Sequence, residues 1–228
     1  INRAQTTSVK VTKNWTDEND TPIGTGTEDD PRLPEEVDVV LYQRVVKADA
    51  TEQNPNTDPG VPYGVYRLEK AKGWALDIEN LPKTGIDGSG NIVTYEYTVK
   101  EVETENFVAT NPTNWENTPE TKITDENGAT TTQDNTLIVT NKLKTLEVSV
   151  QKVWTETTTT KKPVDIVVKR YILDPDTQTK VVDNSFVGTT FKFTVEEATA
   201  ATPVVKKAEN LPIYGTITEN GKTLTGAF

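Results

Sequence analysis

Cysteine and histidine are both absent from this sequence of 228 residues. Without cysteine, the chain forms no disulfide and no zinc site built on thiolates. Without histidine, it lacks the commonest general base, the commonest metal ligand and every Ser-His or Cys-His nucleophile pair. The absence of histidine argues against an enzyme more strongly than any other single feature, and it leaves catalysis by carboxylates alone, as in glycosidases.

Positive charge is scarce, with 24 Lys and Arg residues against 35 Asp and Glu residues, a net charge of −11 and a pI near 4.6. This balance argues against nucleic acid and against anionic membrane surfaces as partners, because both need a basic protein surface. No window approaches 18 consecutive apolar residues, so no membrane insertion is predicted. A chain that starts at Ile1 and shows no signal peptide is interpreted as a fragment of a longer protein.

Hydrophobic residues make up only 33% of the chain, yet they cluster in short runs that alternate with polar residues. Period-2 alternation with β-branched and aromatic residues predicts strands, and no stretch shows a helical period with caps. The fold class is therefore predicted to be all-β, with several small cores. The predicted strands are residues 8–15, 36–45, 61–68, 73–79, 93–103, 136–142, 145–155, 163–172, 180–187, 190–197 and 203–208.

The chain contains two copies of one pattern. Three segments recur in the same order: VKVTKNW (9–15) and VSVQKVW (148–154), RLPEEVDVVLY (32–42) and KKPVDIVVKRY (161–171), IENLPKTG (78–85) and AENLPIYG (208–215). The first copy continues with VTYEYTVKEVE (93–103) and NTLIVTNK (135–142), for which the second copy shows no counterpart. The sequence thus predicts a complete β-sandwich over residues 1–143 and a second one over residues 144–228 that lacks its closing strands.

The pentapeptide LPKTG at Leu81–Gly85 fits the LPxTG pattern that sortases cut when they attach proteins to bacterial cell walls. The second copy reads NLPIYG at the same place, which is no sortase signal. A turn and a core strand follow the pentapeptide, whereas a working signal is followed by an apolar stretch and basic residues. We interpret Asn-Leu-Pro as a structural element that follows a strand and opens a turn.

Several polar residues fall in the buried phase of predicted strands. Lys13 lies between Val11 and Trp15, Glu101 continues an apolar row, Asn141 follows Val139 by two residues, and Lys152 repeats Lys13 in the second copy. Each could lie at a strand end and extend its polar group to water. Because an unpaired buried charge costs several kcal/mol, the joint pattern predicts that the lysine and the glutamate pair.

These three residue types support a specific reaction. Burial lowers the pKa of a lysine and raises that of a glutamate, so the pair can exist as a neutral amine and a neutral acid. The amine is then a nucleophile toward the amide carbonyl of an asparagine, and the acid polarises that carbonyl and transfers protons. The product is a Lys–Asn isopeptide bond with release of ammonia, formed because the fold holds the reactants together.

The whole pattern resembles the Cna protein B-type domain of Gram-positive surface proteins and pilins. The residues that carry the resemblance are, in order, Lys13 and Trp15 (Lys152 and Trp154 in copy two), a V-x-V strand after Pro, Asn-Leu-Pro, then Tyr97, Val99 and Glu101, and finally Ile138 and Asn141. The resemblance implies a reversed immunoglobulin-like β-sandwich for each copy. It also implies an isopeptide bond between Lys13 and Asn141, assisted by Glu101.

Two features depart from the pattern of this family. The family's sequence after the glutamate often includes Ala-Pro-x-Gly-Tyr, whereas this chain reads EVETENFVATN, and Glu103 shares the phase of Glu101 as an alternative assisting acid. For Lys152 the glutamate and asparagine partners are not found in this sequence. Glu196 and Glu197 precede Asn-Leu-Pro, whereas Glu101 follows it, so their order argues against them.

The resemblance implies a structural stalk or shaft module of an extracellular adhesin or pilin on a bacterial cell surface. It implies no cofactor, no metal and no catalytic turnover. Implied partners are neighbouring domains of the same protein or pilus, with host matrix proteins or glycans bound by other domains. No Tyr-Pro-Lys pilin motif is present.

Alternative functions are an adhesin that binds host protein or glycan through its loops, and a carboxylate glycosidase, for which no acid pair is evident. Trp74 and Trp115 are sugar-stacking candidates, although packing is the favoured interpretation. The acidic clusters at 17–20 and 174–176 are interpreted as solvated loops in preference to calcium sites.

Overall fold

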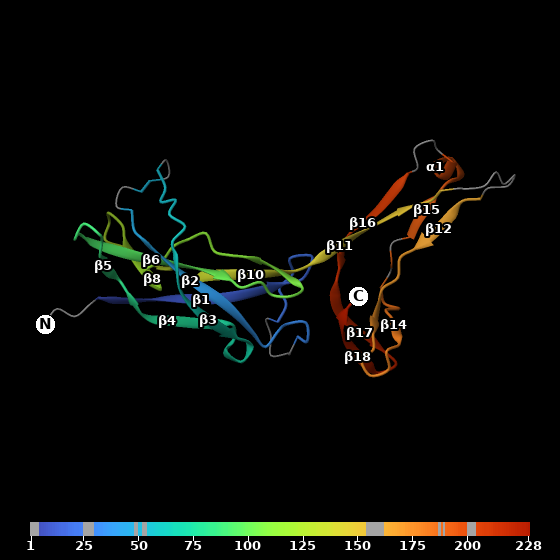
Figure 1. The fold of residues 1–228 in the computed structure, drawn as a ribbon, viewed down its shortest axis with the longest axis horizontal. Coiled ribbons are helices and arrows are strands. Elements are labelled where there is room, and N and C mark those ends of the chain that lie inside the picture. Colours follow the sequence, from blue (N-terminus) through green and yellow to red (C-terminus); the bar gives the residue numbers. More distant parts are fainter. Residues whose placement is uncertain are drawn as a thin grey trace. The chain divides into compact units, whose positions relative to one another are not determined.

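The structure is a computed structural model that describes residues 5–24, 30–47, 50–51, 54–153, 162–186, 188, 190–199 and 204–228. Nearly all of its regular structure is β, which confirms the predicted all-β class (Figure 1). Within the described residues, helices are limited to the single turn η1 (Lys70–Lys72) and the short α1 (Val195–Thr199). The chain divides into two compact units: unit 1 comprises Ile1–Thr16 and Pro34–Lys142, and unit 2 comprises Asp17–Leu33 and Leu143–Phe228.

Unit 1 contains two four-stranded sheets. The first has the order β4 (Ala75–Pro82), β1 (Thr6–Thr16), β10 (Leu137–Leu143), β7 (Phe107–Thr110). The second has the order β3 (Val61–Glu69), β2 (Glu36–Val45), β6 (Ile92–Glu101), β5 (Thr84–Ile86). Contacts between β1 and β6 side chains join the two sheets face to face, as in a β-sandwich.

The core of unit 1 follows the period-2 alternation of its strands. The buried apolar side chains come from both sheets and include Val9, Val11 and Trp15 of β1, Val37, Val39 and Leu41 of β2, Tyr97 and Val99 of β6, and Leu137 and Val139 of β10. Their burial explains why these runs form strands even though the chain is poor in hydrophobic residues.

The first and last core strands of unit 1 are neighbours. β1 pairs with β10 in parallel, with Val11 opposite Leu137 and Thr16 opposite Lys142, and it pairs antiparallel with β4 on its other side (Figure 1). Parallel neighbours need a long connection. Here the connection is most of unit 1, so the pairing of β1 with β10 closes the sandwich.

The Asn-Leu-Pro segment lies at a β-bulge in both copies. In unit 1 two residues, including Asn80 at φ 60°, lie opposite the single residue Ser8 between β1 and β4. In unit 2, Asn210 at φ 57° occupies the same place between β11 and β16. Asparagine suits this position because it tolerates the left-handed region better than most residues.

The LPKTG residues are part of the sandwich. The prediction that Asn-Leu-Pro follows a strand and opens a turn is wrong: all three residues are the end of β4 (Ala75–Pro82), and only Lys83 separates them from Thr84 and Gly85 of β5. Leu81 is buried, and the Pro82 carbonyl accepts a hydrogen bond of 2.5 Å from the Tyr97 hydroxyl.

In the described residues of unit 2, the strands pair in twos. The pairs are β11 (Thr145–Gln151) with β16 (Val205–Pro212), β12 (Val164–Val167) with β15 (Thr190–Phe193), β13 (Tyr171–Leu173) with β14 (Lys180–Val182), and β17 (Tyr214–Glu219) with β18 (Lys222–Ala227). Two small hydrophobic clusters form its core, one around Ile172, Ile217 and Leu224 and the other around Phe191, Phe193 and Ala208.

The hairpin β17–β18 repeats the hairpin β5–β6. The Tyr95 N–H donates to the Lys83 carbonyl at 2.9 Å, and the Phe228 N–H donates to the Ile213 carbonyl at 3.0 Å. Gly85 and Gly215 each lie against the ring of the corresponding aromatic residue. Residues 222–228 therefore correspond to the beginning of β6. The sequence pattern predicted no counterpart of residues 93–103, because the two segments share their strand pairing and not their residue types.

Several predicted strands differ from the observed elements. The predicted strand 163–172 is two strands, β12 and β13, and the predicted strand 190–197 ends at Phe193 and is followed by α1. Six strands were not predicted: β5, β7, β17 and β18, and the hairpin of β8 (Glu120–Thr124) and β9 (Thr130–Asp134). Every residue of β8 and β9 is exposed, so these strands carry no apolar alternation that a sequence pattern could detect.

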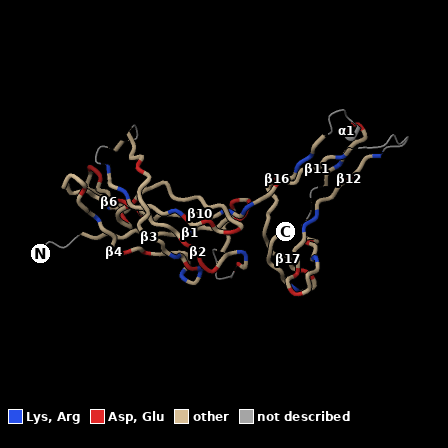
Figure 2. The backbone as a smooth tube through the Cα atoms, viewed as in Figure 1, with Lys and Arg blue, Asp and Glu red and all other residues tan. Residues whose placement is uncertain are grey.

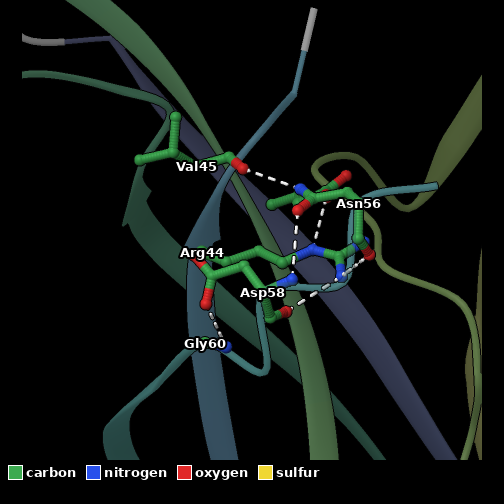
Figure 3. A network of polar contacts seen from close by, with 6 residues as sticks. Arg44, Val45, Asn56, Asp58 and Gly60 are labelled. Atoms are coloured by element: carbon green, nitrogen blue, oxygen red, sulfur yellow. Dashed lines mark hydrogen bonds and ion pairs between the residues drawn. The ribbon is translucent and has the colours of Figure 1, made fainter. Parts of the chain in front are cut away.

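Arg44 anchors the connection between β2 and β3 in unit 1 (Figure 3). Its guanidinium group donates to the Glu96 carboxylate at 2.6 Å and to the carbonyls of Asn56 at 2.9 Å and Asp58 at 3.1 Å. The Asn56 side chain in turn donates to the Val45 carbonyl. Arginine suits this role because its fixed fork of donors bonds several acceptors at once.

Charge is distributed unevenly along the chain. Acidic residues clearly outnumber basic ones in residues 1–143, whereas the two kinds are nearly balanced in residues 144–228 (Figure 2). The negative net charge of the chain thus comes from the first copy. None of the described helices is long and apolar enough to cross a membrane.

Candidate cross-linking site

Lys13 lies inside the sandwich of unit 1. It is in the middle of β1, between Val11 and Trp15 on the inward face, and its side chain is fully buried. Its ammonium nitrogen lies 4.3 Å from the centroid of the Trp15 ring. The Trp15 ring packs edge-on against Trp74 and Phe107, so aromatic residues form one wall around the amine.

Glu101 reaches Lys13 from the opposite sheet. It ends β6, where it lies opposite Val39 of β2, and its side chain is fully buried. Its Oε2 atom contacts the Nζ atom of Lys13 in a hydrogen-bonded ion pair. The two residues are 88 positions apart in the sequence, so only the stacking of the sheets brings them together.

Asn141 completes the group from the strand beside Lys13. It lies opposite Trp15 in the parallel register of β1 and β10, whereas Lys13 lies opposite Val139, so Asn141 and Lys13 are diagonal neighbours on one face. Asn141 is completely buried, and its side-chain nitrogen donates to Glu101 Oε1 at 2.8 Å. One carboxyl group therefore contacts both the lysine amine and the asparagine amide.

Two further side chains hold Glu101, and the sequence pattern identified neither. The Thr104 hydroxyl donates to Glu101 Oε1, and the Asn111 side-chain oxygen accepts from the Glu101 backbone N–H at 2.8 Å. Both residues lie in the segment VETENFVATN (102–111), which has no alternation that would place them near the core. A threonine and an asparagine outside a strand pattern do not by themselves indicate residues of a functional site.

Burial changes the acidity of Lys13. Removal of the ammonium group from water lowers the pKa of Lys13 to about 8, although the hydrogen bond and the charge of Glu101 act in the opposite direction. A lysine with this pKa supplies a neutral amine in roughly a tenth of the molecules at pH 7.

Two buried polar atoms beside this group have no hydrogen-bond partner: Asn141 Oδ1 and Trp15 Nε1. Asn141 and Trp15 form a register pair on β10 and β1. An unpaired buried carbonyl oxygen costs free energy, since it has lost water without gaining a donor. The amide of Asn141 is thus bonded through its nitrogen while its carbonyl group has no donor.

Glu103, the alternative assisting acid, is exposed at the surface of unit 1. It is Glu101 that contacts both Lys13 and Asn141. Glu103 is exposed because β6 ends at Glu101, so the alternation of a strand no longer applies two residues later.

In the second copy, Lys152 follows the end of β11 and is only partly buried. Its amine donates to the Val153 carbonyl at 3.2 Å, and Trp154 lies outside the described residues. Glu196 and Glu197 belong to α1, where Glu197 forms an ion pair with Lys206 at 2.9 Å. The structure therefore places these two acids on a helix and not on a strand that could face Lys152.

The two candidate sugar-stacking residues differ in environment. Trp74 is buried against Trp15, with 5.0 Å between ring centroids. Trp115 borders an open hollow of about 560 Å³, and the Arg44 guanidinium group lies 4.0 Å from its ring centroid. The arginine and Asn56 on this hollow already bond neighbouring protein groups, so the geometry favours packing.

Both acidic clusters considered as calcium sites bond the protein itself. Asp17 accepts the backbone N–H groups of Asn19 and Thr21, and Asp174 forms an ion pair with Lys222 at 2.6 Å. Among the described residues, no group of three or more acidic side chains is placed to hold a metal ion.

No protein-family model matches the sequence, and no curated protein matches it either. Similar solved structures include a single B repeat unit of the collagen-binding surface protein Cna of Staphylococcus aureus (22% identity, TM-score 0.33, covering 60% of this chain and 50% of that one). The shaft pilin SpaA from Lactobacillus rhamnosus GG is also similar (14% identity, TM-score 0.40, covering 98% of this chain and 94% of that one).

A third similar structure is the pilus adhesin SpaC of the same organism (19% identity, TM-score 0.32, covering 98% of this chain and 22% of that one). The chain spans about half the length of the B-repeat structures that it matches. These structures are Cna B repeat units and pilus proteins, the group that the sequence resembles.

Proposed function

We propose that residues 1–143 form a structural module of a bacterial cell-surface stalk or pilus shaft, closed by a self-formed isopeptide bond between Lys13 and Asn141. The observation that carries this proposal is the Glu101 carboxyl group, which contacts the Lys13 amine with one oxygen and the Asn141 amide with the other inside the core. A buried Lys–Glu pair alone is weak evidence for stability, since desolvation offsets its attraction. The Asn141 amide beside the pair supplies a group with which the Lys13 amine can react.

The reaction begins with a proton transfer within the ion pair. Glu101 Oε2 takes a proton from the Lys13 ammonium group, which leaves a neutral amine beside a neutral acid. The lowered pKa of Lys13 favours this step, because burial penalises the charged amine. The amine nitrogen then attacks the side-chain carbonyl carbon of Asn141.

The second step breaks the carbon–nitrogen bond of the Asn141 amide. Both nitrogens are now bonded to one carbon, so Glu101 passes the proton on its Oε2 atom to the Asn141 nitrogen, whose N–H group is hydrogen-bonded to Oε1, and ammonia leaves. Of the two hydrogens on the neutral amine, one stays on the new amide and the other passes to the Glu101 carboxylate, which becomes a neutral acid again. The rate arises from proximity, since the sandwich holds all three groups in contact.

The bond would join β1 and β10, the neighbouring parallel strands that close the sandwich. On the chain-entropy model, closing a loop of roughly 100 residues stabilises a fold by about 4–5 kcal/mol. Tension between the two ends of the module would pass from β1 to β10 through the amide and bypass the rest of the sandwich. Such a module suits an extracellular stalk, where it works without disulfides.

The same proposal extends to the rest of the chain. Residues 144–228 are a second module of the same kind, with Lys152 as its cross-linking lysine, and the partners of the chain are neighbouring domains of the same surface protein or pilus. The module needs no cofactor and performs no turnover, because its single reaction consumes its own side chains.

Intact mass tests the proposed bond. The purified full chain is expected to be one ammonia lighter than its sequence mass, and a proteolytic digest is expected to contain a branched peptide that joins Lys13 to Asn141. A chain with the full sequence mass, in which amine reagents label Lys13 after unfolding, would overturn the proposal.

A further inference from the structure

The carboxyl group of Glu101 has a third partner that the proposed reaction does not consume. Its Oε2 atom contacts Lys13, whereas its Oε1 atom accepts hydrogen bonds from both Asn141 and the Thr104 hydroxyl. Thr104 is half-buried and lies just beyond the end of β6. A carboxyl group can rotate about its last side-chain bond, so a second donor on one oxygen fixes which oxygen faces which reactant.

The backbone of Glu101 is held as well. Glu101 lies at the end of β6, and its N–H donates to the Asn111 side chain at 2.8 Å. Asn111 directly follows β7, a strand of the opposite sheet. Glu101 is therefore held at its backbone by one residue and at its carboxyl group by another, and neither residue is among the reacting groups.

We propose that Thr104 is a positioning residue for isopeptide formation: its hydroxyl group holds Glu101 Oε1 toward Asn141 and so leaves Oε2 for Lys13. Asn111 supports this arrangement by fixing the backbone of Glu101. The inference rests on the proposed cross-linking function and adds a residue to it. Thr104 belongs to the segment in which this chain departs from the Ala-Pro-x-Gly-Tyr sequence of the family it resembles, so the resemblance assigns it no role.

The expected effect follows from the geometry. Without the hydroxyl group, Oε1 keeps a single donor, and the carboxyl group can rotate away from the position in which it serves both reactants. Loss of a hydrogen bond to a charged group corresponds to a change of about tenfold or more in a rate that depends on it. Folding should change little, because valine has nearly the shape of threonine and Thr104 is not part of a strand.

The experiment compares four full-length chains: wild type, Thr104→Val, Thr104→Ser, and the control Thr132→Val, which makes the same change at an exposed position of β9. Each chain is made by cell-free translation, quenched into denaturant before it reacts and refolded by dilution. Intact mass then follows the loss of ammonia with time, and tryptophan fluorescence follows folding in the same samples.

Wild type, Thr104→Ser and Thr132→Val are expected to react at similar rates, and Thr104→Val about tenfold or more slowly with unchanged folding kinetics. Reaction of Thr104→Val at the wild-type rate would overturn the role of Thr104 while leaving the cross-link intact. A slow Thr104→Ser chain would also overturn it, since the hydroxyl group is then not what matters. If wild type loses no ammonia, the proposed function itself fails, which is a separate outcome.

If Thr104→Val folds poorly, Asn111→Ala gives a second measurement, because it loosens the Glu101 backbone without touching the carboxyl group. It is expected to slow the reaction of molecules that have folded. An unchanged rate in folded Asn111→Ala would contradict the arrangement proposed for the Glu101 backbone.

Discussion

Lys13 and Asn141 are diagonal neighbours on two parallel strands of one sheet, with both side chains inside the sandwich. They are separated by most of unit 1 in the sequence, and the other strands of the sandwich lie between them in chain order. The Glu101 carboxyl group of the opposite sheet contacts both. A bond formed there would therefore close the whole unit.

Glu101→Gln is expected to abolish isopeptide formation, because an amide cannot take the proton from Lys13 and deliver it to the Asn141 nitrogen. Glu103→Gln, the matched control at the exposed acid, is expected to leave the bond intact. Intact mass of the two variants distinguishes them by one ammonia. Loss of the bond in Glu103→Gln alone would show that the other acid assists.

The rate of bond formation is expected to be level from pH 6 to pH 7 and to fall above about pH 8. Proton transfer inside the Lys13–Glu101 pair leaves its number of protons unchanged, so the share of the reactive neutral pair is constant below the pKa of Lys13, which burial lowers to about 8. Above that value the pair loses its proton to water, and Glu101 has none to pass to the Asn141 nitrogen. Mass spectrometry of chains refolded at each pH measures the rate, and fluorescence confirms that folding is faster than the reaction. A rate that rises about tenfold per pH unit from pH 6 to pH 8 would show that loss of the Lys13 proton to water, and not its transfer to Glu101, precedes attack.

Asn141→Ala is expected to lower the free energy of unfolding of unit 1 by about 4–5 kcal/mol, since the chain loses the closed loop. Denaturant titration followed by tryptophan fluorescence measures this change, because Trp15 and Trp74 are both in the core of unit 1. Asn114→Ala removes an exposed amide of the same unit and serves as the control. Equal unfolding midpoints for wild type and Asn141→Ala would contradict a stabilising cross-link.

Gly90→Ala is expected to destabilise unit 1 by about 1 kcal/mol, whereas Gly88→Ala in the same turn should have no such cost. Gly90 has φ 85°, in the left-handed region that disfavours a Cβ atom, and an added Cβ at either glycine meets no atom within 4 Å. The comparison thus isolates backbone conformation from packing. Thermal unfolding of the two variants measures it, and similar losses in both would contradict this account of the turn.

Sortase is expected not to cut the folded chain between Thr84 and Gly85. Leu81 is buried, Thr84 and Gly85 pair with Thr94 and Val93 of β6, and the Lys83 carbonyl accepts the Tyr95 N–H. A protease-like active site needs an extended segment that is free of such bonds. Gel analysis after incubation tests this, with a synthetic peptide of residues 78–88 as the positive control, and efficient cleavage of the folded chain would overturn the structural interpretation.

The sequence pattern predicted the central strands best where apolar residues alternate. Residues 36–45 were predicted as a strand, and β2 has those bounds. The pattern failed for β8 and β9, which have no buried face, and at residues 195–199, where Thr194 and Glu197 bond each other's backbone N–H groups and start a helical turn. Local hydrogen bonds determine the structure of these segments, and the hydrophobic period of the sequence contains no information about such bonds.

The amino-acid pattern is enough to predict that the chain is β-rich, that its pattern is duplicated and that Lys13, Glu101 and Asn141 occupy inward positions of strands, because side-chain direction in a strand follows from counting by two. Which acid contacts the lysine, and which residues hold that acid, depends on how the strands pack. Thr104, Asn111 and Glu101 come together because β6 ends where it does and the chain then crosses to β7 in the other sheet. Contacts of this kind depend on where strands stop and how sheets stack, and neither is encoded in the period of a single strand.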